Sequence, residues 1–298
     1  MNRGTYSIVA RDPATGEIGV AVQSHWFSVG PIVPWAQAGV GAVATQANVD
    51  MSYGPRGLEL LREGLDAGQA LAQLVAEDAG AAGRQVAIVD RQGGVAVHTG
   101  SICIPYAGDA AGESVSCQAN MMASGDVWPR MLEAYRATPG ALADRLLAAL
   151  DAGEDAGGDV RGRQSAALLV VPDEGEPWEF LVSLRVEDHP DPLGELRRLL
   201  ILNDAYVLAG QADELVNEAR HDEAAELYQR ASALAPENHE LRFWAGLGAA
   251  QAGDLDAGLT HIRAAIEMHP NWRELLGRLP PEVAPAAPAL LARLAESG

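Results

Sequence analysis

The chain has 298 residues, 48% of them hydrophobic, and its 41 acidic and 21 basic residues give a formal net charge of −20. This length and apolar content allow one large domain or two smaller ones with a packed core, which excludes an intrinsically disordered chain. The negative charge argues against partners that are nucleic acids or anionic membrane surfaces.

The first residues lead into a strand without an apolar signal-peptide core, and no run approaches the ~18 apolar residues of a membrane helix. Cys103 and Cys117 are too few for a disulfide framework and lack metal-type spacing, so two reduced thiols are expected. No histidine pairs with a helical glutamate at zinc-site spacing. These features predict a cytoplasmic protein with no metal and no cofactor.

Residues 1–187 are predicted to form a domain of mixed α and β structure. The expected order is strands, two helices, strands, two helices and strands. Strands are expected at 5–11, 17–22, 39–46, 85–90, 94–99, 114–118, 164–171 and 178–186, and helices at 55–63, 67–77, 126–137 and 141–152.

The hairpins in this order indicate antiparallel pairing, and the paired helices indicate helical layers on both sides of a sheet structure. The regular alternation of single strands and helices that builds a doubly wound parallel sheet is missing. The predicted fold class is therefore α+β, with a four-layer αββα sandwich in the first domain.

Residues 188–298 are predicted to be all helical, beginning with an amphipathic helix at 193–210. Residues 225–236 match 259–270 at an offset of 34, with a proline after each helix. This period resembles tetratricopeptide repeats over 213–276. Such repeats bind a protein or peptide partner, or pack on their own chain or on a second subunit. We expect a homo-oligomer, because both domains offer apolar faces.

Polar residues gather at four places in the first domain where strands or loops end. Amides recur in all four, and amides both donate and accept hydrogen bonds, which suits a carbonyl or amide substrate better than a phosphate. In addition, a hydroxyl residue, Thr5, opens the first strand. The four clusters are 23–26, 46–57, 116–122 and 157–165.

The clusters and the strands around them resemble a known family. The segments are SIVARDPATGEIGVAVQSHWFSVG, VGAVATQANVD, YGPRGLELL, CQANMM and GGDVRGRQSAALLV, and together they resemble domain-of-unknown-function family 1028 over nearly all of residues 5–186. That family is similar to the N-terminal-nucleophile (Ntn) hydrolases, which implies an αββα sandwich. In Ntn hydrolases the first residue of the mature chain is Thr, Ser or Cys, and its free α-amine acts as the base for its own side chain. The resemblance makes Thr5 the candidate nucleophile.

The chain departs from that pattern because four residues, Met1 to Gly4, precede Thr5. Removal of the initiator methionine alone would expose Asn2. Either the bond between Gly4 and Thr5 is cleaved, or the start of the chain is misassigned, or Thr5 has no free α-amine and is not a nucleophile.

His25 and Asp50 are the other candidate catalytic residues. His25 could orient the substrate or act as a base, or it could be a structural histidine at a strand end. Asp50, like Asp159, could hold an ammonium group or a water, or could cap a turn. The candidate substrate-binding residues are Ser24, Gln46, Tyr53, Gln118, Asn120, Asp159, Arg161 and Gln164.

Two of these groups have a structural alternative. Arg161 and Arg163 could clamp a substrate carboxylate, or could pair with the protein's own acids. Gln118 and Asn120 could form an oxyanion site, or a buried amide network.

The sequence predicts a hydrolase that cleaves a C–N bond in a small amide or ureido compound. The alternative is a non-catalytic binding or scaffold protein whose helical repeats mediate protein–protein interaction. A peptidoglycan-linked role would rest on family analogy alone.

Overall fold

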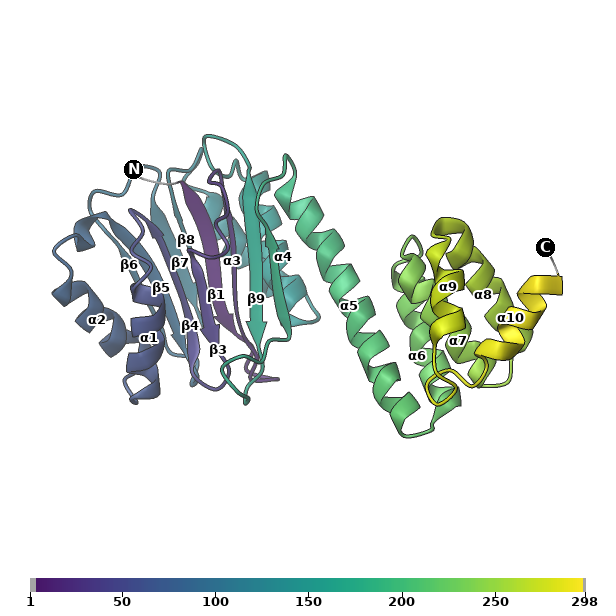
Figure 1. The fold of residues 1–298 in the computed structure, drawn as a ribbon. Helices are drawn as coiled ribbons and strands as arrows, with labels where there is room; N and C mark the ends of the chain where they lie inside the picture. The colour runs from purple at the N-terminus through teal and green to yellow at the C-terminus, as the bar shows by residue number, and fades with distance from the viewer. Residues whose placement is uncertain (1–3, 297–298) are drawn as a thin grey trace. The chain divides into compact units, whose positions relative to one another are not determined.

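The computed structural model describes residues 4–296, and the chain divides into two compact units, one ending at Arg198 and the other beginning at Leu199. Figure 1 shows the strands in the first unit and a set of helices in the second. Of residues 4–296, no helix is both long enough and apolar enough to cross a membrane.

The larger of two antiparallel sheets in the first unit has six strands in the order β10-β9-β2-β1-β8-β7. Its centre is β1, whose first residue Thr5 lies opposite Ser24 of β2 and Asn120 of β8. The strands are β1 (Thr5–Arg11), β2 (Ile18–Ser24), β7 (Gly108–Gly112), β8 (Val115–Asn120), β9 (Ser165–Val171) and β10 (Val182–Val186).

The smaller sheet has four strands in the order β3-β4-β5-β6 and packs face to face on the larger one, with β4 and β5 against β1. Alternate residues of β1 point to opposite faces, so Ser7 and Val9 face the smaller sheet while Tyr6 faces the helices. The strands are β3 (Pro34–Gln37), β4 (Gly41–Ala47), β5 (Arg84–Asp90) and β6 (Val95–Thr99).

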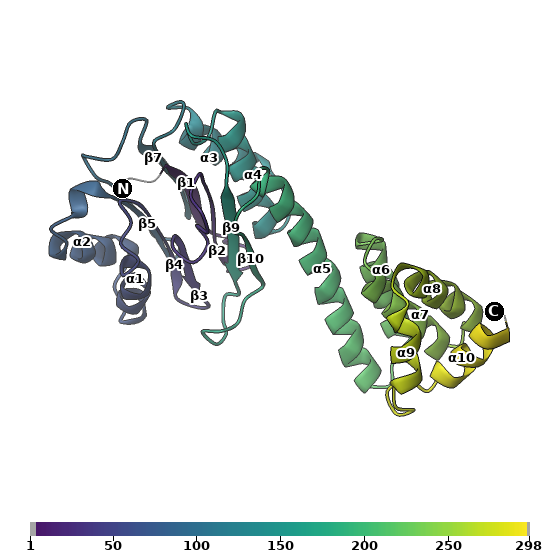
Figure 2. The same cartoon turned by 45° about the horizontal axis from the view of Figure 1, so that its top comes forward.

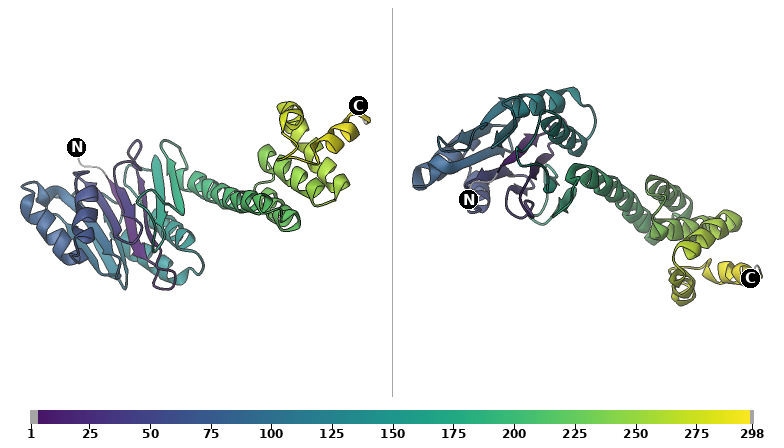
Figure 3. Two further views of the ribbon diagram at one scale, coloured as in Figure 1. Left: turned by 60° about the horizontal axis from the view of Figure 1, so that its bottom comes forward. Right: turned by 90° about the horizontal axis from the view of Figure 1, so that it is seen from above.

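Two helices cover the outer face of each sheet, which gives four layers (Figures 2 and 3). Helices α1 (Tyr53–Arg62) and α2 (Ala67–Glu77) pack on the smaller sheet, and α3 (Val127–Ala137) and α4 (Leu142–Asp155) on the larger one. Small and β-branched residues such as Val20, Ala44 and Val89 fill the space between the sheets.

The second unit is helical. Helix α5 (Pro192–Asn217) begins before the division and continues past it, and it is followed by α6 (His221–Leu234), α7 (His239–Gln251), α8 (Leu255–Met268), α9 (Asn271–Arg278) and α10 (Ala287–Glu296). Both the first and the last residues of α6 and α8 are 34 positions apart, which is the offset seen in the sequence. Helices α7 and α8 cross closely, at Gly246 and Gly258.

The structure differs from the predicted elements most clearly at four of them. Strands β3 (PWAQ) and β7 (GDAAG) were not predicted, because both are short, only partly buried and poor in β-branched residues. Strand β10 begins at Val182 rather than at 178, and the residues just before it are exposed. Helix α5 runs to Asn217 rather than to 210, and its seven added residues show no break in helical pattern.

Candidate active site

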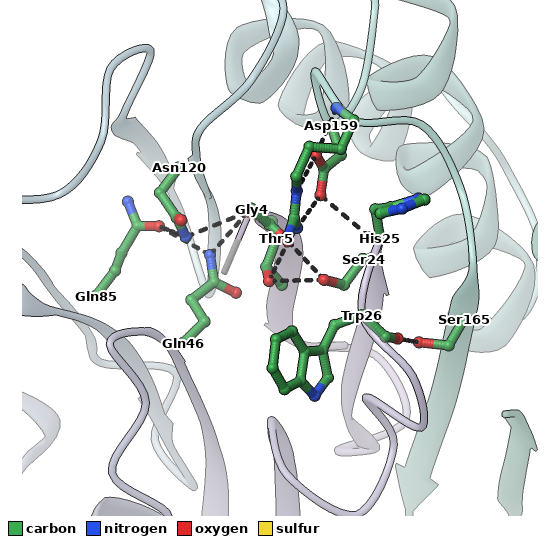
Figure 4. Close-up of polar contacts among 11 residues, drawn as sticks. Gly4, Thr5, Ser24, His25, Trp26, Gln46, Gln85, Asn120, Asp159 and Ser165 are labelled. Atoms are coloured by element: carbon green, nitrogen blue, oxygen red, sulfur yellow. Dashed lines mark hydrogen bonds and ion pairs between the residues drawn. The ribbon is translucent and has the colours of Figure 1, made fainter. Parts of the chain in front are cut away.

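The candidate site lies at the end of the larger sheet where β1 begins and β2 and β8 end. Thr5 is 2% exposed there, and Ser24 and Asn120 beside it are buried as well. Antiparallel pairing brings these three polar residues together, because the first residue of one strand faces the last residue of each neighbour. Figure 4 shows the side chains around Thr5.

The carbonyl oxygen of Gly4 accepts hydrogen bonds from three side chains. The donors are Thr5 Oγ1 at 2.6 Å, Ser24 Oγ at 2.5 Å and Arg161 Nη2 at 3.0 Å. The two hydroxyl groups are also 3.1 Å apart. The Thr5 hydroxyl therefore lies beside a peptide carbonyl whose oxygen also accepts hydrogen bonds from a second hydroxyl and a guanidinium, and donors placed in this way can stabilise an oxyanion.

The carboxylate of Asp159 holds Arg161 in this position. It accepts hydrogen bonds from Nε and Nη2 of Arg161 at 3.0 and 2.7 Å, and from the backbone N–H groups of Arg161 and His25. The Asp159 side chain is completely buried, whereas that of Arg161 is 29% exposed. This bidentate pairing fixes the guanidinium plane and leaves Nη2 aimed at Gly4.

A network of buried amides lies between the two sheets behind Thr5. Gln46 Nε2 donates to the Thr5 carbonyl at 3.3 Å and to Gln85 Oε1 at 2.8 Å, and Asn120 Nδ2 donates to the same Gln85 oxygen at 3.0 Å. Ser7 joins Gln46 to Gln118 through two hydrogen bonds of 2.6 Å. These contacts hold β1 at the Thr5 carbonyl and at Ser7.

Five of the residues predicted from the sequence thus gather around Thr5 and its backbone. Ser24 and Arg161 contact the Gly4 carbonyl, and Asp159 holds Arg161. Gln46 and Asn120 lie within hydrogen-bond distance of the Thr5 carbonyl, the latter at 3.5 Å. Gln118 is one step further away, in the amide network.

His25 is next to the site but turns its ring away from it. Figure 4 shows the imidazole directed away from Thr5, and its contact with the site is the backbone N–H bond to Asp159. Its Nδ1 is buried and has no hydrogen-bond partner among residues 4–296. This geometry favours the reading of His25 as a structural residue at a strand end.

Four other predicted residues have partners elsewhere. Asp50 caps the turn before α1 through the Ser52 N–H and pairs at 3.8 Å with Arg84. The Tyr53 hydroxyl donates to Asp78 at 3.0 Å. Burial and this carboxylate raise the pKa of Tyr53.

The remaining two residues, Arg163 and Gln164, are at the end of the fourth cluster, and their side chains contact acidic residues outside it. Gln164 Nε2 donates to Asp188 at 3.1 Å, on the surface. Arg163 forms ion pairs with Glu154 and Asp191, so it is used by the protein's own acids.

Three residues of the site were not among the predicted ones. Gly4 was not predicted because it contributes its backbone carbonyl, and a glycine has no side chain that would indicate a function. Ser7 follows Thr5 at the two-residue spacing of one strand face, and Gln85 directly precedes the apolar run of β5. Both patterns place a polar group between sheets and were visible in the sequence.

Neither cysteine contacts the residues around the Gly4 carbonyl in the hydrogen bonds described above. Cys103 and Cys117 are free, and burial raises the pKa of both thiols. Within residues 4–296 no three His, Cys, Asp or Glu side chains gather as they would to hold a metal ion.

Comparison with known proteins adds a family. The crystal structure of a DUF1028 protein from Silicibacter pomeroyi is similar at 35% identity and a TM-score of 0.61, over 66% of this chain and 84% of that one. The ancestral beta-subunit Anbu from Yersinia bercovieri matches at 13% identity and a TM-score of 0.33, over 65% and 91%, which is too weak to support an argument. No curated protein matched. The model of the family of unknown function DUF1028 matches residues 5–196, so this chain belongs to that family.

Proposed function

We propose that this protein is an Ntn-type hydrolase that cleaves C–N bonds in a small amide or ureido compound, with Thr5 as the nucleophile. The observation that carries the proposal is the carbonyl of Gly4, which is held by Ser24 and Arg161 with the Thr5 hydroxyl against it. The four layers of helix, sheet, sheet and helix agree with an Ntn-type sandwich.

In this proposal the enzyme first cleaves its own chain. Thr5 Oγ1 attacks the Gly4 carbonyl carbon, the C–N bond to Thr5 breaks, and the hydroxyl proton ends on the new α-amine. Ser24 and Arg161 stabilise the negative charge on the carbonyl oxygen during this step. Water then hydrolyses the ester, which releases residues 1–4 with a carboxylate end and restores the Thr5 hydroxyl.

The mature site would use the same groups on a substrate. The freed α-amine of Thr5, with an ordinary pKa of about 8, takes the proton of its own hydroxyl as the oxygen attacks the substrate carbonyl. The oxygen of that carbonyl takes the place that the Gly4 oxygen leaves. Gln46 and Asn120 keep the Thr5 backbone in register through its carbonyl.

Intact-mass spectrometry of the purified full chain tests the proposal. We expect the mass of a chain that begins at Thr5, and the uncut mass for Thr5→Ala. Ser24→Ala, which lacks one oxyanion donor, should be cut about 10²-fold more slowly. Ser116→Ala is the matched control, because this buried hydroxyl bonds Gln118 and lies outside the Gly4 contacts. A wild-type chain that keeps residues 1–4, or a Thr5→Ala chain that is cut, contradicts the proposal.

A second candidate function is partner binding by the helical unit. A cavity of about 410 Å³ in that unit is lined by Tyr228 and Trp244 and by the acids Asp213 and Glu240. An aromatic and acidic lining suits a peptide with apolar and basic side chains. Two results together would favour this function over hydrolysis. The wild-type chain would keep residues 1–4 and hydrolyse no amide, and it would bind a basic peptide that the Glu240→Arg variant does not bind.

A further inference from the structure

The position of Gly4 carries information about the acyl group that this site accepts. If Thr5 is acylated by Gly4, as in the function proposed above, the Gly4 residue is the first acyl group to occupy the site. Its surroundings therefore describe the space beside the reacting carbonyl.

The α-carbon of Gly4 lies directly against Asp159. A Cβ built on Gly4 with L geometry would be 2.6 Å from Asp159 Oδ2, 2.8 Å from Oδ1 and 2.8 Å from Cγ. Separations below about 3 Å are not tolerated between non-bonded atoms of this kind, so either the side chain or the carboxylate would have to move.

Asp159 cannot move without cost. Its carboxylate accepts the hydrogen bonds of Arg161 and of the His25 N–H, and its backbone bridges to Met122. A shift that made room for a methyl group would break the ion pair that aims Arg161 at the carbonyl oxygen. The same carboxylate thus holds the oxyanion donor and limits the space beside the acyl carbon.

We infer that the substrates of this site are amides of acyl groups with an unsubstituted α-carbon, such as glycyl or acetyl, and that Asp159 is the residue that excludes L-substituted acyl groups. This inference rests on the proposed function of Thr5. Asp159 acts here as a positioning and specificity residue, because it touches the acyl group and does not react with it.

Self-cleavage provides the first test. Full chains are synthesised in a cell-free system and the fraction that begins at Thr5 is followed by intact mass. We expect Gly4→Ala to be cut at least ~10-fold more slowly than wild type, because of the overlap with Asp159. Gly68→Ala, an exposed glycine of α2 in the same unit, is the matched control and should be cut at the wild-type rate. Thermal unfolding of uncut Gly4→Ala and Thr5→Ala chains checks that both are folded.

The mature enzyme provides the second test, which stands if Gly4→Ala fails to fold. The p-nitroanilides of glycine, acetic acid and L-alanine share one leaving group. We expect kcat/KM for the better of the first two to exceed that for L-alanine by at least ~10-fold. In Asp159→Ala both rates fall, since Arg161 loses its partner, but the ratio moves towards one.

The outcomes separate the two proposals. If no chain is ever cut at Thr5, the proposed function fails and the inference fails with it. If wild type is cut but Gly4→Ala is cut as fast, or the mature enzyme hydrolyses L-alanine p-nitroanilide as well as the others, the inference alone is overturned. Failure of the mature enzyme to hydrolyse any of the three anilides also overturns it.

Discussion

At the scale of single residues, the site depends on one carbonyl oxygen and one carboxylate. The Gly4 oxygen gathers the side chains of Thr5, Ser24 and Arg161, and the Asp159 carboxylate fixes the third of them. A buried charge is costly unless it is paired and hydrogen-bonded, and the Asp159 side chain is both. The fold therefore places a buried, paired carboxylate beside the carbonyl that would develop charge in the proposed reaction.

A second ion pair of the first unit, between Asp78 and Arg84, lies away from the Gly4 contacts and is expected to affect stability only. Asp78 accepts hydrogen bonds from Arg84 Nε at 2.8 Å and from the Tyr53 hydroxyl. The pKa of Asp78 is lowered to about 2, and the main cause is the hydrogen bond from Arg84. Because the pKa is lower in the folded protein than the ordinary 3.8, the pair stabilises the fold above about pH 4, and this contribution is lost as the pH falls towards 2.

We therefore expect Asp78→Asn to lower the free energy of unfolding by about 1–2 kcal/mol at pH 7. The difference from wild type should shrink between pH 4 and pH 2, where the wild-type carboxylate becomes protonated. Urea denaturation at pH 7, 5 and 3.5 measures it. Cleavage at Thr5 should be unchanged, since Asp78 and Tyr53 lie outside the Gly4 contacts. A large loss of cleavage in a folded Asp78→Asn chain would contradict this expectation and would indicate that Tyr53, which donates to Asp78, has a role in the site.

At the scale of elements, a strand can be predicted from the sequence when its own residues form a strong apolar, β-branched pattern. The central strands β1, β2 and β5 are buried and rich in Val and Ile, and they were predicted within a residue or two of their observed ends. The edge strands β3 and β7 have no such pattern, because their pairing comes from the neighbouring strand rather than from their own residues.

The candidate site follows the same rule. Ser24 and Asn120 are predicted site residues because they fall in polar clusters. Their place beside Thr5 follows from the strand order and antiparallel register of the structure, which are not predicted from the sequence. Tyr53 and Gln164 lie within the polar clusters of the sequence, yet their side chains donate hydrogen bonds to acids away from Thr5. Side-chain direction on a helix or in a loop is set by packing, which the order of polar residues does not encode.

The crossing of α7 and α8 gives a prediction at this scale. A Cβ at Gly258 would lie 2.7 Å from the Gly246 carbonyl oxygen and 2.8 Å from Ala250 Cβ, so the helices would have to separate. We expect Gly258→Ala to destabilise the helical unit by about 1–2 kcal/mol, as overpacking outweighs the gain in helix propensity. Gly210→Ala in α5, where nothing lies within 4 Å, is the matched control and should stabilise by up to about 1 kcal/mol. Circular dichroism during urea unfolding measures the change in the free energy of unfolding for both variants. If the two changes have the same sign, the close crossing of α7 and α8 is contradicted.

At the scale of the whole molecule, the residues of the proposed chemistry all belong to the first compact unit. The Gly4 contacts, the ion pair of Asp159 and the amide network involve residues 4 to 161, whereas the second unit begins at Leu199. The family match likewise covers 5–196 and ends within α5, before Leu199, where the second unit begins. Hydrolysis and any binding by the helices are thus expected to be separable properties of one chain.

Gly258→Ala tests that separability in the intact protein. The substitution weakens the packing of α7 on α8, and no residue of the Gly4 contacts lies in those helices. We therefore expect its cleavage at Thr5 to match wild type within about twofold, even at temperatures where the helical signal has begun to fall. The measurement is the fraction of chains that begin at Thr5, followed over time by intact mass, with Ser24→Ala as the variant that should slow. If Gly258→Ala slows cleavage as much as Ser24→Ala does, the two units are coupled and the helical part is required for the chemistry.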